Sequence, residues 1–258
     1  MGGRGSKSGL QPTPTPITVR QPIPPQPLMQ PGPPPDLTPN SELQTATQAT
    51  ATLAQIAAMT DDQLAAAVIA SRSVDMPNFL NDVPDETQRF VYQVGLNGAP
   101  QVMDQQQFDQ FRRQNNIPRS QIMARGVSGN SPYTAQQIAD MFRYSELNYI
   151  GGKHGGQVSG AGTYFDMNGG GSTGYGGGAL ITAIYNPATA RVIDWRALRQ
   201  QSASFAASHP KFARAVGSFH SSTASIYALA MGYNAISGGP VSPSYQNIID
   251  RSAVIVVK

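Results

Sequence analysis

Prolines divide this chain into a segment that cannot form regular secondary structure and a remainder that can. Twelve of the 21 prolines lie between Pro12 and Pro39. Proline has no backbone N–H and holds φ fixed, which excludes helix interiors and central strands. We therefore expect residues 1–40 to form an extended or disordered arm outside any core. Its composition leaves two interpretations open, a passive linker or a peptide that lies along a partner surface.

Charge and cysteine content argue against several kinds of site. Only 13% of the residues are charged, the formal net charge is +3, and no basic cluster exceeds Arg112-Arg113. Nucleic-acid binding is therefore unlikely on composition and is only a third interpretation. The chain has no cysteine, and its three histidines at 154, 209 and 220 lack the spacing of metal ligands. We expect no metal site.

Apolar residues never run long enough for a membrane span, which needs about 18 in succession. The first residues, MGGRGSKSG, lead into prolines rather than an apolar segment. We therefore expect neither a membrane span nor a secretory signal.

Helix signals dominate residues 41–116, which we expect to form a helical lobe. Thr60 and Gln63 have the spacing of a capping box, and Asp104 stands where it can cap a later helix. Apolar residues recur at helical spacing between these points. The expected helices cover residues 41–59, 62–73, 83–95 and 105–116.

Strand signals dominate residues 117–258, which we expect to form a second, α+β domain. Thr134 begins a further helix with its own capping box, another helix covers residues 221–231, and Trp195 anchors a strand-to-helix junction. The expected strands cover residues 121–124, 162–165, 179–185, 191–194 and 252–257.

Glycine is concentrated next to the expected strand at 162–165. Residues 151–178 hold 13 of the 26 glycines, together with Tyr164 and Tyr175. Glycine permits positive φ and close approach of a ligand to the backbone. Two tyrosines in such a segment indicate a slot for a flat ring.

Four motifs in order resemble those of the ADP-ribosyltransferases, and more narrowly the phage-encoded, head-associated members of that family. The resemblance covers roughly residues 80–258, and the spacing after Tyr164 is also similar to that of poly(ADP-ribose) polymerases. The motifs are Arg125-Gly126, Gly160-Ala161-Gly162-Thr163-Tyr164-Phe165, the pair Ser172 and Tyr175, and the closing run of residues 232–236 with 248–253.

The resemblance implies a split β-sheet core and NAD as substrate. Cleavage of the nicotinamide–ribose bond passes through an oxocarbenium-like transition state, so the ring, its amide and the ribose must be held rigidly. By the resemblance, the nicotinamide amide bonds the Gly126 backbone and Ser172, while Tyr164 and Tyr175 enclose the ring. Arg125 reaches the ribose or a phosphate. Each residue alone also has a structural interpretation, such as a surface ion pair for Arg125 or a core position for Tyr164.

The acid of active family members is missing from its expected place. There, a late glutamate bonds the ribose and stabilises the developing cation, whereas Gln246 occupies the matching position here. Gln246 can bond a hydroxyl but carries no charge, and loss of one such contact typically costs on the order of 10²–10³ in rate. Arg125, Tyr164 and Gln246 are the candidate catalytic residues.

Two functions follow as hypotheses. The first is a phage mono-ADP-ribosyltransferase that modifies a host protein, in the virion or in the host cytoplasm. The second is an inactive virion protein that keeps the same fold and uses residues 1–40 to contact phage head or connector proteins.

Overall fold

The computed structural model describes residues 52–74, 86–96, 98–129, 132–145, 161–167, 178–240 and 242–258. The predicted arm, the first part of the expected helix at 41–59, and both Ser172 and Tyr175 lie outside these residues. Of the glycine-rich segment, the structure describes residues 161–167 and Gly178.

Capping boxes begin four of the helices. In each, the N-cap side chain accepts a hydrogen bond from the backbone N–H three residues on, and the glutamine there bonds back to the N-cap N–H. The pairs are Thr52–Gln55, Thr60–Gln63, Asp104–Gln107 and Thr134–Gln137. The described α-helices are α1 (Leu53–Ala57), α2 (Asp61–Ser71), α3 (Glu86–Gln93), α4 (Gln105–Gln114), α5 (Ala135–Tyr144), α6 (Trp195–Ser208), α7 (Pro210–Val216) and α8 (Ala224–Ala230).

A mixed eight-stranded sheet runs through the described residues, with strand order β1-β8-β4-β2-β3-β7-β6-β5. The α+β class predicted from the sequence is confirmed. Pairs β1–β8 and β5–β6 are parallel and the other pairs are antiparallel. The strands are β1 (Gln101–Met103), β2 (Met123–Val127), β3 (Thr163–Asp166), β4 (Ala179–Tyr185), β5 (Val192–Asp194), β6 (Ala235–Ser237), β7 (Tyr245–Ile248) and β8 (Val254–Val257).

The pairing between β2 and β3, in the middle of the sheet, is the shortest in the sheet. Strands β2 and β3 pair only at Ala124 and Asp166, whereas β2 pairs with β4 along its whole length. Beyond that pair, Arg125, Gly126 and Val127 have no ladder partner in β3. The sheet is thus two four-stranded halves joined at one point.

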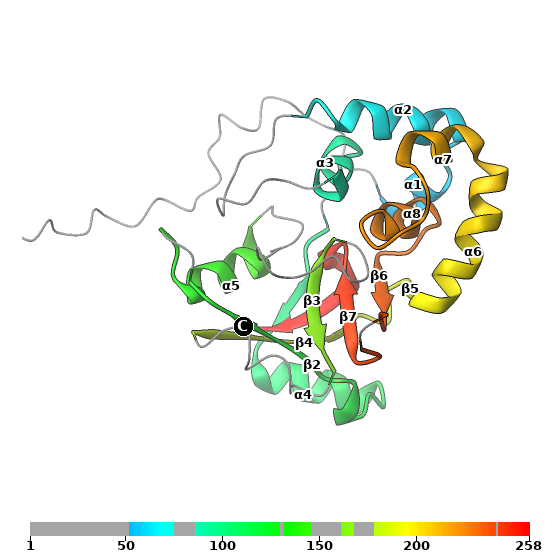
Figure 1. Cartoon of the computed structure of the whole chain (residues 1–258). Helices are drawn as coiled ribbons and strands as arrows, with labels where there is room; N and C mark the ends of the chain where they lie inside the picture. Colours follow the sequence, from blue (N-terminus) through cyan, green and yellow to red (C-terminus); the bar gives the residue numbers. More distant parts are fainter. Residues whose placement is uncertain are drawn as a thin grey trace, which may run out of the picture. The chain divides into compact units, whose positions relative to one another are not determined.

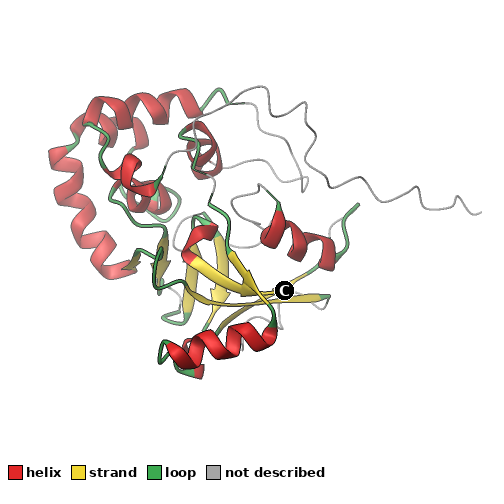
Figure 2. Ribbon diagram, turned by 180° about the vertical axis from the view of Figure 1, so that it is seen from behind, coloured by secondary structure: helices red, strands yellow, loops and turns green. Residues whose placement is uncertain are grey.

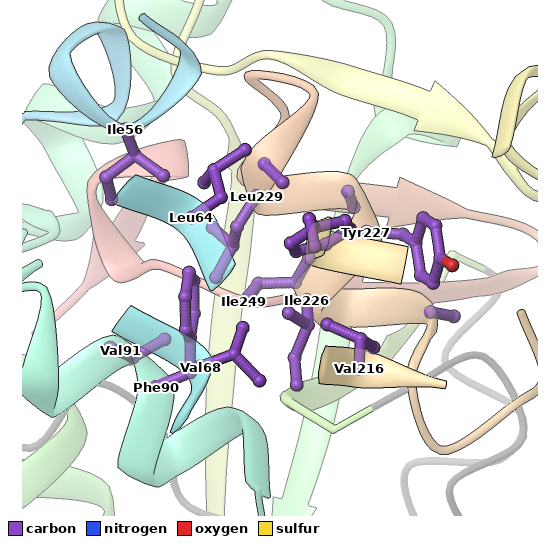
Figure 3. Packing of buried hydrophobic residues seen from close by; sticks show 14 of the residues in the cluster. Ile56, Leu64, Val68, Phe90, Val91, Val216, Ile226, Tyr227, Leu229 and Ile249 are labelled. Atoms are coloured by element: carbon purple, nitrogen blue, oxygen red, sulfur yellow. The ribbon is translucent and has the colours of Figure 1, made fainter. Parts of the chain in front are cut away.

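Helices from both ends of the chain share the largest core. Leu64 and Val68 from α2 pack with Phe90 from α3 and with Ile226 and Leu229 from α8 (Figure 3). Residues 48–258 form one compact unit. The helices expected within residues 41–116 therefore bury their apolar faces against the C-terminal half of the chain.

Helix α2 also fixes the start of α7. The Asp61 carboxylate accepts hydrogen bonds from the backbone N–H groups of Lys211 and Phe212, at 3.0 and 2.8 Å. Helix α7 begins with Pro210, so its first turn depends on a carboxylate that is distant in the sequence.

The half-sheet β1-β8-β4-β2 is covered on both faces. On one face, Phe108 of α4 packs on Ile184 and Ile255. On the other, Phe142 of α5 packs with Met123 of β2 and Ile181 of β4. The Phe142 ring centroid lies 5.8 Å from that of Phe165 in the adjoining strand β3. Figures 1 and 2 show α4 on the side of the sheet away from α1, α2 and α7. No helix among the described residues is long and apolar enough to cross a membrane.

Candidate functional site

Arg125 bridges the two halves of the sheet at the point where they separate. It lies in β2, one residue past the Ala124–Asp166 pair, and its Nη1 donates to the Tyr164 carbonyl oxygen at 3.0 Å. A side chain thus spans β2 and β3 where ladder hydrogen bonds are missing. Gly126 follows it in the same stretch and is buried.

Among the described residues, no acid forms an ion pair with Arg125. Its Nε is enclosed and has no hydrogen-bond partner among the described residues, although part of the residue reaches the surface. Loss of water around the guanidinium lowers the pKa of Arg125 to about 10. A half-enclosed cation of this kind favours an anionic ligand.

Tyr164 projects from β3 on the face opposite to Phe165, since side chains alternate along a strand. It stands across from Asn247 of β7, and its ring meets that of Tyr245 edge-on with centroids 6.4 Å apart. The half-buried Tyr164 ring therefore has an aromatic neighbour that the sequence motifs did not indicate.

Gln246 belongs to the other face of β7. It pairs with Phe165, and directly paired residues of an antiparallel ladder share a face. Its Oε1 accepts from the Tyr185 hydroxyl at 2.7 Å, and its Nε2 donates to the Ser244 carbonyl at 3.2 Å. Burial raises the pKa of Tyr185, which keeps that hydroxyl protonated as a donor. The Gln246 amide is thus engaged within the protein.

The three candidate catalytic residues consequently lie on three neighbouring strands, but their side chains do not converge. The Arg125 guanidinium donates to the Tyr164 backbone carbonyl. Arg125 alternates with Ala124, the partner of Asp166. The register therefore places the Arg125 and Gln246 side chains on one face and the Tyr164 ring on the other. Their proximity in the sheet follows from strand order, which the motif order alone does not specify.

Packing explains one glycine of the Gly-x-Gly motif. A Cβ on Gly162 would lie 1.9 Å from Oδ1 of the buried Asn247. Ser225 of α8 donates to the Ala161 carbonyl at 2.7 Å, and the Asn247 Nδ2 lies 3.3 Å from the Ser225 Oγ. Asn247 and Ser225 therefore hold the start of β3 in place.

Sequence reasoning missed Asn247, Ser225 and Tyr185 as supports of the site. The only signal for Asn247 in the sequence is that this amide residue directly precedes the apolar pair Ile248-Ile249 at the end of β7. Ser225 and Tyr185 carry no local signal, because their partners are distant in the sequence.

Among the described residues, no group of three or more histidine, aspartate or glutamate side chains could hold a metal ion. Comparison of this chain with protein-family models, curated proteins and solved structures found no match.

Proposed function

We propose that this protein binds NAD at the junction of β2 and β3 and transfers ADP-ribose to a host protein. The observation that carries the proposal is Arg125, a cation without an acid partner among the described residues, held beside Tyr164 where the sheet divides. NAD supplies the missing negative charge through its diphosphate. Arginine is well suited to that group because its fork of donors matches phosphate oxygens.

The other residues have roles in the same proposal. The Tyr164 ring, already in edge contact with Tyr245, offers a surface for nicotinamide, and each such contact is worth about 0.5–1.5 kcal/mol beyond area burial. Gly126 offers its backbone to the carboxamide. The family resemblance assigns contacts with the same ring to Ser172 and Tyr175, which lie outside the described residues. In the reaction, the C–N bond to nicotinamide breaks and nicotinamide leaves with the bonding electrons. A nucleophile of the acceptor then bonds ribose C1′ and loses its proton.

The state of Gln246 favours a second candidate function. Its amide is neutral, bonded to Tyr185 and Ser244, and on the face away from Tyr164. A residue so placed gives an oxocarbenium ion little electrostatic support. The second candidate is therefore a catalytically weak or inactive virion protein that keeps the fold for assembly and contacts head or connector proteins through residues 1–40.

NAD binding tests the first step of the proposal. We expect the full chain to bind NAD in calorimetry, Arg125→Met to weaken binding at least tenfold, and Arg113→Met to leave it unchanged. Arg113 is the control because it is an exposed arginine on α4. If the unaltered protein does not bind NAD, the transferase proposal is refuted.

Nicotinamide release separates the two candidates. A transferase is supported if the NAD-bound protein releases nicotinamide and if Tyr164→Phe and Tyr164→Ala each reduce that release, by different amounts. Binding without release supports the inactive virion protein. The inactive virion protein also requires residues 1–40 for its association with phage particles. If a variant without these residues is incorporated fully into particles, the proposed attachment through residues 1–40 is ruled out.

A further inference from the structure

A hollow lies between the start of α6 and the turn after β6, at the β6-β5 end of the sheet, whereas Arg125 lies in β2 three strands away from β6. It has a volume of about 640 Å³, within the roughly 300–1,000 Å³ range of small-ligand sites. Figure 1 shows α6 as an outer helix beside β5 and β6. The lining residues are Trp195, Arg196, Arg199, Gln200, Gly239 and Pro240.

The two arginines of the hollow have no ion-pair partner in the part of the chain that the structure describes. Arg196 and Arg199 are exposed, and neither guanidinium makes a hydrogen bond or ion pair with another described residue. Residues three apart on a helix are neighbours on its surface. Two free guanidinium groups thus face the same space, which suits an anion with several oxygens such as a phosphate.

The acid closest in sequence is already engaged. Asp194 caps α6, and its Oδ1 accepts from the backbone N–H groups of Arg196 and Ala197 at 2.8 and 3.2 Å. The first-turn N–H groups are therefore satisfied by this cap, so the anion site consists of the arginine side chains and not of the helix end.

Trp195 gives the hollow an aromatic wall. The residue is half-buried, and its ring packs against Phe219 with centroids 5.6 Å apart. An indole fixed on one side presents a rigid surface on which the planar ring of a base can stack. Carboxylates of an acidic peptide have no need of such a wall.

We propose that this hollow binds a nucleotide, with its phosphates on Arg196 and Arg199 and its base against Trp195. The nucleotide is either free or one unit of a single strand, and both present the same phosphate and ring. This site uses none of the residues assigned to NAD chemistry, so it does not depend on the proposed transferase function.

Trp195 is the only tryptophan in the chain, so intrinsic fluorescence reports directly on this hollow. We expect ADP to quench the tryptophan fluorescence of the full chain saturably. Arg196→Gln and Arg199→Gln should each weaken ADP binding about tenfold, because hydrogen bonds to charged groups contribute about 1.5 kcal/mol or more. Arg113→Gln should have no effect. ADP is used instead of NAD so that a failure of NAD binding and a failure at this hollow are separate results.

Three further outcomes decide the proposal. Tighter binding of a short oligothymidylate, weakened by the same two variants, would identify the nucleotide as part of a strand. Equal quenching by polyglutamate would overturn the nucleotide assignment in favour of an acidic peptide. Absence of quenching at millimolar ADP, or quenching that neither variant weakens, would overturn the site itself.

Discussion

Replacement of Arg125 by methionine should stabilise the protein while it removes the proposed NAD contact. The pKa of Arg125 falls well below its ordinary value, to about 10, because burial removes water from the guanidinium. At about 1.4 kcal/mol for each tenfold change, keeping the charge in the folded state costs roughly 3 kcal/mol. Methionine keeps most of the apolar stem but loses the hydrogen bond to the Tyr164 carbonyl, which is worth about 2 kcal/mol because its donor is charged.

The net expectation is a gain of roughly 1 kcal/mol in the free energy of unfolding at pH 7. For a unit of this size that corresponds to a rise in Tm of roughly 2–4 °C. Urea denaturation and thermal unfolding, each without added nucleotide, measure the two quantities. The pKa depression disfavours only the charged form, so the cost is present throughout the pH range below about 10.

Arg143→Met is the matched control, because Arg143 is a buried arginine with a full set of partners. It donates to Asp140, to the Val257 carbonyl and to the Leu180 carbonyl, at 2.9, 2.9 and 3.2 Å. Loss of the charged hydrogen bonds to the two carbonyl oxygens should cost about 3 kcal/mol, whereas the pair with Asp140, whose side chain is 39% exposed, adds little. If Arg125→Met destabilises the protein as much as Arg143→Met, Arg125 is a compensated cation and the argument for an anionic ligand there is wrong.

Three further predictions concern the supports of the site. Gly162→Ala should lower the unfolding free energy by roughly 3 kcal/mol, because its Cβ would meet Asn247 at 1.9 Å and the Ile248 carbonyl at 2.7 Å. Gly217→Ala meets nothing within 4 Å, but its φ of 92° and ψ of −174° are essentially restricted to glycine, so it should cost about 1–3 kcal/mol through the backbone alone. An unchanged urea midpoint for Gly162→Ala would refute the packing argument. Tyr185→Phe should cost about 1–2 kcal/mol by removing the donor to Gln246, and an unchanged urea midpoint would show that this bond contributes nothing. Burial raises the pKa of Asp250, so its contribution to stability is full below its unfolded pKa of about 3.9 and declines as pH rises through the folded value. Asp250→Asn should therefore gain stability relative to the unaltered protein between about pH 4 and pH 7, and a constant difference across that range would contradict the raised pKa.

Local patterns explain why many elements could be predicted. Thr60, Asp104 and Thr134 each bond a backbone N–H only three residues away, so their capping boxes form regardless of the rest of the fold. The strand expected at 179–185 matches β4 at both ends, because its apolar run continues without glycine or proline.

Other elements escaped prediction because their partners are distant. Helix α7 depends on Asp61, and β6 and β7 are short strands that are defined by each other and by β3 and β5. A three-residue segment such as Ala235–Ser237 has no periodicity of its own.

The candidate site divides in the same way. The sequence by itself determined which chemical groups are available: Arg125 after a short strand, Tyr164 after glycines, and a neutral Gln246 near the end of the chain. Only the tertiary structure decided that Arg125 has no acid beside it among the described residues, and that Tyr164 and Gln246 lie on opposite faces. The physical reason is that burial, charge balance and the facing of side chains depend on strand order and register, which connect residues far apart in the chain.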